Sequence, residues 1–211
     1  MDCRLCKSRA ELFYTGQLGE YFSCSRCLGV FMSPDSHLSQ EGERARYESH
    51  TNGEDDASYL AFVAPIVDEI RGSFTTGKRG LDFGCGTGQR AISSTLKKSG
   101  YSVEQYDPIF KKDTSVFRHR YDFIACCEVI GHFRHPAREF LKLQALLEPK
   151  GKLLCMTELL TAEIDFAKWP YKDDPTHIFF YRPKTVKFIQ DTFGFGKSTI
   201  QDRLVVFENS P

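Results

Sequence analysis

From Lys78 to the C-terminus, short apolar segments alternate with segments whose apolar residues recur at helical spacing. Such alternation is typical of βα units, which build a parallel sheet with helices on both faces. The expected strands are 81–83, 101–106, 121–127, 151–157, 197–201 and 204–207, and the expected helices are 91–99, 136–147 and 186–192. The sequence therefore predicts an α/β fold.

Composition divides the chain into three expected parts. Residues 1–33 contain paired cysteines, residues 34–78 are polar apart from an amphipathic segment at 59–71, and residues 79–211 carry the βα pattern. We expect these parts to form a small cysteine-bearing module, a helical linker, and one larger α/β domain.

Charge and hydropathy exclude several classes of protein. Lysine and arginine together number 28, as do aspartate and glutamate, so no net charge directs the chain to nucleic acid or anionic lipid. No apolar run approaches the roughly 20 residues that span a bilayer, and the N-terminus lacks the pattern of a signal peptide. We therefore expect a soluble, cytoplasmic protein that does not bind membranes.

Two Cys-x-x-Cys pairs, Cys3 with Cys6 and Cys24 with Cys27, are separated by 17 residues. Two such pairs can surround one Zn²⁺ with four thiolates, and this closed arrangement is typical of a structural metal. A module of about 30 residues has too little core to fold alone, so metal binding would supply the missing free energy. Two disulfides or four free thiols are the alternatives. The remaining cysteines lie in apolar segments and are expected to pack in the core: Cys85, Cys126, Cys127 and Cys155.

A glycine-rich loop, Gly84-Cys85-Gly86-Thr87-Gly88, follows the first expected strand and precedes a helix. Glycines there allow a ligand to approach the backbone, and the helix N-terminus offers free N–H groups. Asp107 ends the next strand, where a carboxylate can accept hydrogen bonds from ribose hydroxyls. Gln89 departs from the strict dinucleotide pattern, which disfavours a nicotinamide-dependent oxidoreductase. A strand-to-helix turn without a ligand is the alternative.

Four segments together resemble class I S-adenosylmethionine-dependent methyltransferases. Residues 81–88 resemble the first motif of that family, and Tyr106-Asp107-Pro108 resembles its ribose-binding position. Residues 121–133 resemble the fourth-strand segment, and residues 147–153 resemble the start of the fifth strand. The N-terminal cysteine pairs are similar to a zinc ribbon found in one subset of the superfamily, which includes sugar C-methyltransferases. Ribosomal RNA guanine methyltransferases also carry an N-terminal zinc knuckle.

The resemblance implies that the linker serves as a lid and that the larger domain is Rossmann-like, with a sheet of seven strands of which the last is antiparallel. It also implies methyl transfer from S-adenosylmethionine. It implies that the cofactor contacts are Asp82, Gly84, Cys85, Gly86, Gly88, Asp107, Pro108, Glu128 and, from a preceding lid, Tyr47. Two positions depart from the family pattern. Gly131 stands where the family often has a second glutamate, and Asp113 is only a candidate for the contact to adenine.

An aromatic-rich segment, residues 169–181, follows the strand expected at 151–157 and contains His177. Such a loop would emerge at the carboxyl edge of the sheet, where ligands bind in open α/β folds. His177 is therefore a candidate general base, and Glu128 and His132 are further candidates beside the acceptor. Packing of the aromatic rings, with His177 bonded to a backbone carbonyl, is the alternative. Tyr47, His50 and Asn52 either line the pocket as part of a lid or cap the following helix.

The sequence thus predicts an enzyme that transfers a methyl group to oxygen, nitrogen or carbon of an acceptor. A catalytically inactive binding module is the alternative from another class. Residues 1–33 carry four basic and three acidic side chains, which is little positive charge for a module that holds RNA. A small-molecule acceptor, such as a sugar or metabolite, is therefore favoured over RNA, and the oligomeric state is left open.

Overall fold

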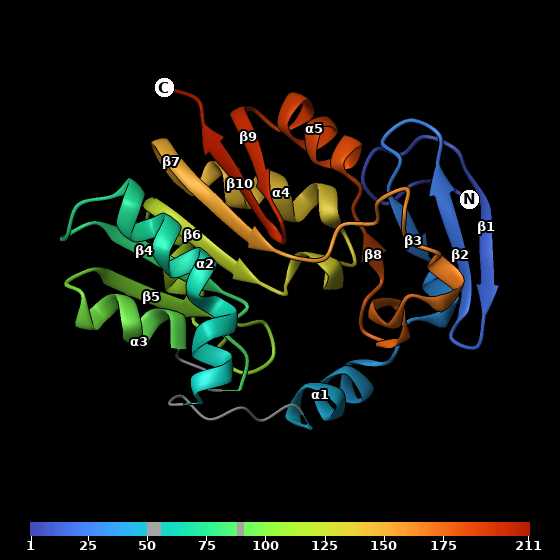
Figure 1. The fold of residues 1–211 in the computed structure, drawn as a ribbon, viewed down its shortest axis with the longest axis horizontal. Coiled ribbons are helices and arrows are strands. Elements are labelled where there is room, and N and C mark those ends of the chain that lie inside the picture. Colours follow the sequence, from blue (N-terminus) through green and yellow to red (C-terminus); the bar gives the residue numbers. More distant parts are fainter. Residues whose placement is uncertain (50–55, 88–90) are drawn as a thin grey trace.

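The computed structural model describes residues 1–49, 56–87 and 91–211, and it contains two sheets (Figure 1). The larger sheet has six strands in the order β5-β4-β6-β7-β10-β9. Its strands are β4 (Arg79–Phe83), β5 (Ser102–Tyr106), β6 (Tyr121–Cys127), β7 (Leu147–Met156), β9 (Phe195–Gln201) and β10 (Leu204–Asn209). Strands β5, β4, β6 and β7 are parallel, and β10 is antiparallel to both of its neighbours.

Helices cover both faces of the larger sheet. The α-helices are α1 (Gln40–Glu48), α2 (Ala57–Ser73), α3 (Ala91–Lys98), α4 (Pro136–Ala145) and α5 (Pro183–Thr192). Because side chains alternate between the two faces of a strand, Phe123 and Ala125 pack with α2 and α3, whereas Ile124 and Cys126 pack with α4 and α5. The 3₁₀ helices are η1 (Pro34–Ser36), η2 (Thr114–Arg118), η3 (Ile130–His132), η4 (Phe166–Lys168) and η5 (Pro170–Asp173).

The predicted α/β architecture is confirmed, but the sheet has six strands rather than seven within the described residues. The strand that would follow β5 is replaced by a polar segment, residues 109–120, which contains only the short helix η2. This segment has no apolar run to bury between neighbouring strands and helices, so β5 is left at the edge of the sheet.

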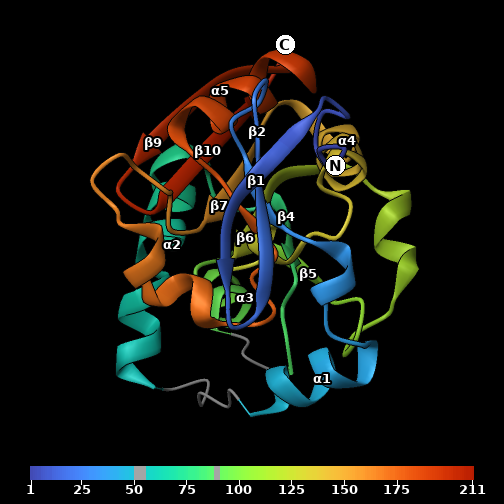
Figure 2. The ribbon, with the colours of Figure 1, turned by 90° about the vertical axis from the view of Figure 1, so that its right-hand side faces the viewer.

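The smaller sheet joins two parts of the chain that are far apart in sequence. Strands β1 (Ala10–Gly16), β2 (Gly19–Cys24) and β3 (Val30–Met32) come from the N-terminal module, and β8 (Phe179–Phe180) pairs with β3. In Figure 2 this sheet faces the viewer, in front of the larger one. The aromatic rings of Tyr21, Phe166 and Phe180 pack together in its core. The aromatic-rich segment is therefore tied to the cysteine-bearing module.

The helical segment expected at 59–71 lies within α2, which begins at Ala57 with Asp56 as its N-cap. None of the helices in the described part of the chain is long and apolar enough to cross a membrane.

Candidate functional site

A cavity of about 1260 Å³ opens at the carboxyl ends of β4, β5 and β6, and α1 and α2 contribute to its walls. Ten of the predicted site residues line it: Tyr47, Asp82, Gly84, Cys85, Gly86, Asp107, Pro108, Glu128, His132 and His177. Gly88, His50 and Asn52 lie outside the described residues. The candidate for the adenine contact, Asp113, does not line the cavity and instead caps η2 by accepting the N–H of Ser115.

The glycine loop lies at the base of the cavity and is held by Asp107. Gly84 and Gly86 have φ angles of 79° and 65°, a region that favours glycine. A Cβ on Gly84 would lie 2.4 Å from Val129, whereas one on Gly86 would meet no atom within 4 Å. The Gly86 backbone therefore borders open space. The Asp107 carboxylate accepts the N–H of Gly86 through Oδ2 at 3.0 Å, and the N–H groups of Ile109 and Phe110 through Oδ1.

Asp82 is a buried acid near the end of β4, one residue before Phe83. Its side chain is only 4% exposed, and Oδ2 has no hydrogen-bond partner in the described structure. Burial raises the pKa of this carboxyl to about 7, although hydrogen bonds from Gln105 and Ser93 act in the opposite direction. A buried oxygen without a partner is unfavourable, so Asp82 is suited to accept a hydrogen bond from a ligand in the cavity.

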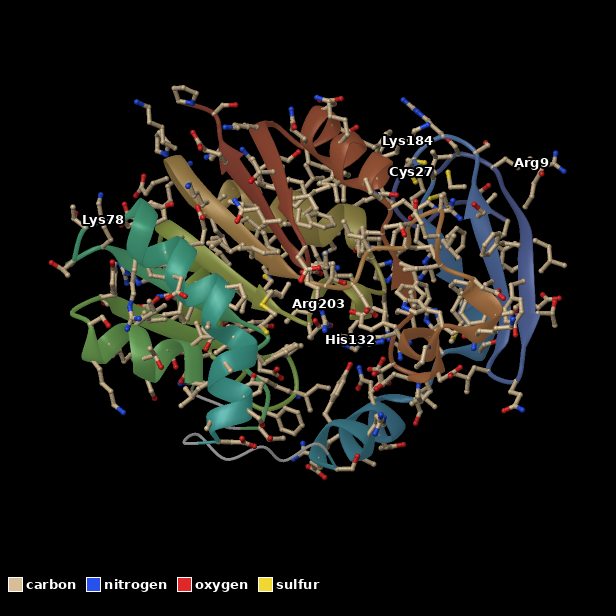
Figure 3. The ribbon with its side chains drawn as sticks, in the orientation of Figure 1. Arg9, Cys27, Lys78, His132, Lys184 and Arg203 are labelled. Carbon is tan, nitrogen blue, oxygen red and sulfur yellow. The ribbon has the colours of Figure 1, made fainter. Side chains whose placement is uncertain are left out.

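Glu128 follows β6 and is held by two donors. Its backbone has a φ of 51°, and its Oε1 accepts from Nη2 of Arg203 at 2.8 Å. Its Oε2 accepts from the hydroxyl of Tyr171 at 2.6 Å, and that hydroxyl lies 3.0 Å from Oγ1 of Thr157. Figure 3 shows Arg203 with His132 in the central part of the molecule. The arrangement keeps Glu128 as a fixed anion at the cavity wall.

The rings of His177 and His132 lie against each other, with centroids 4.6 Å apart and an interplanar angle of 36°. Nδ1 of His177 lies 2.7 Å from the backbone oxygen of Tyr171, and Nδ1 of His132 lies 2.7 Å from that of Thr176. A carbonyl oxygen can only accept, so Nδ1 of His177 carries a proton and Nε2 presents a lone pair in the neutral ring. Burial, together with the neighbouring His177, lowers the pKa of His132 to about 4.

The structure gives a reason for glycine at position 131, where the family often has a glutamate. A Cβ at this position would lie 3.5 Å from Cδ2 of His177 and 3.9 Å from the hydroxyl oxygen of Tyr171. The longer side chain of a glutamate would have to enter the space that these two rings fill. Because Gly131 has no side chain, the rings of His177 and Tyr171 can occupy this space.

A family model described as a methyltransferase domain matches residues 56–197. The chain belongs to this methyltransferase family. The enzyme class expected from the sequence is thereby confirmed. The cysteine-bearing module precedes the matched residues, and no curated protein matches the chain.

Solved structures share the fold of this methyltransferase at low sequence identity. An O-methyltransferase family protein from Burkholderia thailandensis is 15% identical, with 80% of this chain and 63% of that chain covered and a TM-score of 0.54. Magnesium protoporphyrin IX methyltransferase from Synechocystis PCC 6803, solved with bound SAH, is 16% identical, with 83% and 97% covered and a TM-score of 0.54. Phosphoethanolamine N-methyltransferase 2 from Haemonchus contortus is 14% identical, with 77% and 43% covered and a TM-score of 0.54.

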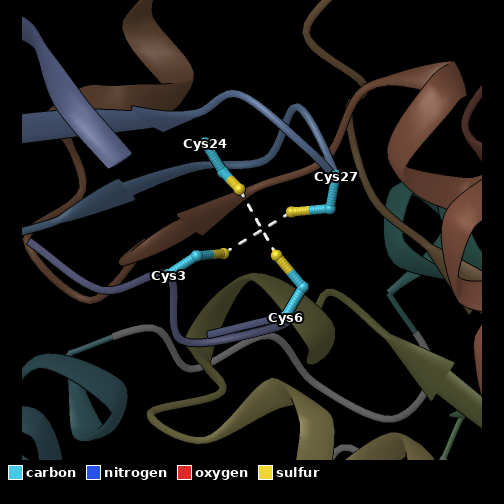
Figure 4. Close-up of side chains that lie close together, drawn as sticks. All are labelled: Cys3, Cys6, Cys24 and Cys27. Atoms are coloured by element: carbon cyan, nitrogen blue, oxygen red, sulfur yellow. Dashed lines mark hydrogen bonds between the residues drawn. The ribbon is translucent and has the colours of Figure 1, made fainter. Parts of the chain in front are cut away.

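The four N-terminal cysteines of the methyltransferase lie together (Figure 4). Their sulfur atoms all lie within 4.8 Å of one another, with 3.5 Å between Cys3 and Cys27 and 3.3 Å between Cys6 and Cys24. A disulfide would need about 2.05 Å, so these separations do not correspond to disulfides, and none of the four cysteines is disulfide-bonded. The two pairs have the same turn: Lys7 and Leu28, each directly after the second cysteine, have φ angles of 61° and 60°.

Sequence reasoning missed three residues of the site of the methyltransferase. Tyr171 was expected only as one aromatic of a loop, and Thr157 and Arg203 were not expected at the site. Arg203 lies in the turn between β9 and β10, and Thr157 follows β7. No motif marks these positions, since their proximity to Glu128 arises from the order of the strands in the sheet.

Proposed function

We propose that this methyltransferase transfers the methyl group of S-adenosylmethionine to oxygen, nitrogen or carbon of a small-molecule acceptor. The observation that carries the proposal is one cavity that contains both the glycine loop with its acids and the pair His132 and His177. A cofactor site and a candidate base thus share one space. Methyl transfer needs both, because the protein must orient the two reactants and accept a proton.

The residues at the base of the cavity fit this cofactor. The backbone at Gly86 borders open space, and Asp82 offers a buried oxygen that lacks a partner in the described structure. Asp107 already accepts three backbone N–H groups, and a carboxylate has about four acceptor sites, so one remains for a ribose hydroxyl. When bound, S-adenosylmethionine supplies a methyl group made reactive by its sulfonium.

His177 is the proposed general base. Its Nδ1–H is fixed on the carbonyl of Tyr171, which leaves Nε2 to take the proton that an acceptor hydroxyl or amine loses as the methyl group is transferred. Glu128 is less suited to this role because both of its oxygens already accept hydrogen bonds. We propose instead that Glu128 contributes a fixed negative charge to the cavity.

Volume and charge favour a small acceptor over RNA. Ligand pockets measure about 300–1,000 Å³, and the cavity of about 1260 Å³ exceeds that range, as a site for a cofactor plus a small acceptor would. Six of its lining residues are lysine or arginine and seven are aspartate or glutamate. A surface that follows a polyphosphate backbone would be predominantly basic.

We further propose that the four clustered cysteines bind one structural zinc ion. Three of the side chains are at most 1% exposed, and the paired turns bring four sulfur ligands into one site of the kind that zinc prefers. Four protein ligands would complete a tetrahedral shell, which suits a structural role.

Ligand binding tests the proposed function most directly. We expect S-adenosylhomocysteine to raise the melting temperature of the zinc-loaded protein, since a ligand at 100 times its Kd stabilises by about 2.7 kcal/mol, and NAD⁺ to leave it unchanged. The protein is then incubated with methyl-labelled S-adenosylmethionine and separate metabolite and RNA fractions. Label is expected in the metabolite fraction. Absence of S-adenosylhomocysteine binding would favour the inactive binding module, and label in RNA would overturn the acceptor class.

A further inference from the structure

We infer that Tyr171 is a positioning residue that holds Glu128 and His177 in fixed orientations at the same time. The catalytic consequence of this inference rests on the proposed function, in which His177 is the general base. Tyr171 belongs to η5, in the aromatic-rich segment, whereas Glu128 follows β6. One residue therefore joins the fixed anion of the cavity to the proposed base.

The hydroxyl of Tyr171 holds Glu128. It donates to Oε2 at 2.6 Å, and Oγ1 of Thr157 lies 3.0 Å from the same hydroxyl oxygen. Burial and the adjacent carboxylate raise the pKa of Tyr171 well above its usual range, so the hydroxyl keeps its proton and remains a donor. With Arg203 on Oε1, Glu128 is held from two sides.

The ring and the main chain of Tyr171 hold His177. The two ring centroids are 4.0 Å apart with an interplanar angle of 31°, and His132 lies on His177 at 4.6 Å. The carbonyl of Tyr171 accepts from Nδ1 of His177, and the backbone N–H of His177 donates to the carbonyl of Asp174 at 3.0 Å. Neighbouring rings thus restrict the tilt of the imidazole, and the carbonyl fixes its tautomer.

Two substitutions separate the hydroxyl contact from the ring contact, while the backbone carbonyl of residue 171 is present in both variants. Tyr171→Phe removes the hydroxyl and keeps the ring against His177, whereas Tyr171→Leu removes both. Tyr101→Phe is the matched control, because the Tyr101 hydroxyl also donates to a partner, the carbonyl of Phe74 at 2.7 Å, and Tyr101 is not among the residues that line the cavity. If Tyr171 contributed only to general stability, the two variants would not differ in which of the Glu128 and His177 signals they change.

The measurement is NMR on the zinc-loaded full chain, with and without S-adenosylhomocysteine. We expect the Nδ1–H signal of His177 to be observable in the wild type, Tyr171→Phe and Tyr101→Phe, and lost to exchange with water in Tyr171→Leu. We expect the carboxyl ¹³C signal of Glu128 to move in Tyr171→Phe and to stay in place in Tyr101→Phe. Should the leucine variant fail to fold, a nuclear Overhauser effect between the Tyr171 ring and His177 Nδ1–H in the wild type tests whether the ring of Tyr171 packs on His177.

An unchanged Nδ1–H signal in a folded Tyr171→Leu, or an unmoved Glu128 signal in Tyr171→Phe, overturns the inference. Absence of the Overhauser effect overturns it as well. These NMR signals are also measured in the ligand-free protein, so they test the inference independently of cofactor binding. A failure to bind S-adenosylhomocysteine would overturn the proposed function instead. With the labelled metabolite fraction, we expect Tyr171→Phe to lower the rate of methyl incorporation at least about tenfold, since small misplacements of reacting groups slow catalysis strongly.

Discussion

The Asp107 carboxylate accepts the backbone N–H of Gly86 across 3.0 Å and thereby ties the glycine loop after β4 to the end of β5. The same carboxylate accepts two N–H groups of its own turn. Asp107 therefore shapes the loop in addition to the ribose contact proposed for it.

Replacing Asp107 should weaken cofactor binding. Hydrogen bonds to charged groups contribute about 1.5–3 kcal/mol, so Asp107→Ala should lower the affinity for S-adenosylhomocysteine at least about tenfold in calorimetry. Asp113→Ala, which removes an exposed cap outside the cavity, is the control and should bind as the wild type does. An Asp107→Ala protein that is folded and binds with unchanged affinity would contradict the assignment.

Replacing His177 should affect methyl transfer more than cofactor binding. If Nε2 takes the acceptor proton, His177→Gln should lower the transfer rate by about 10²–10⁴ while the affinity for S-adenosylhomocysteine stays within about twofold. The rate is measured as label incorporated into the metabolite fraction. His177 would be a packing residue if His177→Gln lost only stability and retained the wild-type rate.

Asp82 should make the ligand-free protein less stable as the pH rises from about 4 to about 7. Its pKa is about 7 in the folded chain and about 3.9 in an unfolded one, so within this window the folded state holds a proton that the unfolded state has released. The stabilisation is present below about pH 4 and is lost as the pH rises through 7. Urea unfolding of Asp82→Asn should show a flatter dependence than that of the wild type or of the exposed-site control Asp35→Asn. Parallel curves would mean that Asp82 keeps an ordinary pKa.

One zinc ion per chain is expected in metal analysis of the purified protein. Cys24→Ser should release the metal, because it removes one of four ligands, and should lower the melting temperature. The aromatic-rich segment should also become more susceptible to proteolysis, since β8 pairs with β3 of the cysteine-bearing module. A metal content well below one zinc per chain in the wild type would refute the site.

Gly131 should tolerate alanine and reject glutamate. A Cβ would lie at ordinary contact distance from His177, but a longer side chain would displace the rings of His177 and Tyr171, and overpacking destabilises by about 1–3 kcal/mol. We expect Gly131→Ala to have a near-native free energy of unfolding and Gly131→Glu a clearly lower one. Equal stabilities would show that the space beside His177 can expand.

Features set by local pattern were predictable from the sequence, and features set by distant contacts were not. The glycine loop, Asp107 and the core strands follow from residue type and spacing, and the structure places the loop and Asp107 at the carboxyl ends of β4 and β5. The contact between Glu128 and Arg203 joins residues 75 positions apart, and no periodicity reports it. The count of seven strands came from the family resemblance alone, whereas the six strands expected from the apolar pattern are the six that the described residues form; residues 109–120 lack the apolar run that a further strand needs.

The pairing of β8 with β3 limits the exchange of the N-terminal module for that of another protein. Phe179, which pairs with Phe31, lies two residues after His177, so the proposed base is anchored to a sheet that begins before the methyltransferase domain does. Removing or exchanging the first 33 residues would expose the edge of β8 and the aromatic rings beneath it. The cysteine-bearing module and the aromatic-rich segment therefore form one structural unit, so a substitution in β8 has to remain compatible with residues of β3, which lie about 150 positions earlier in the sequence.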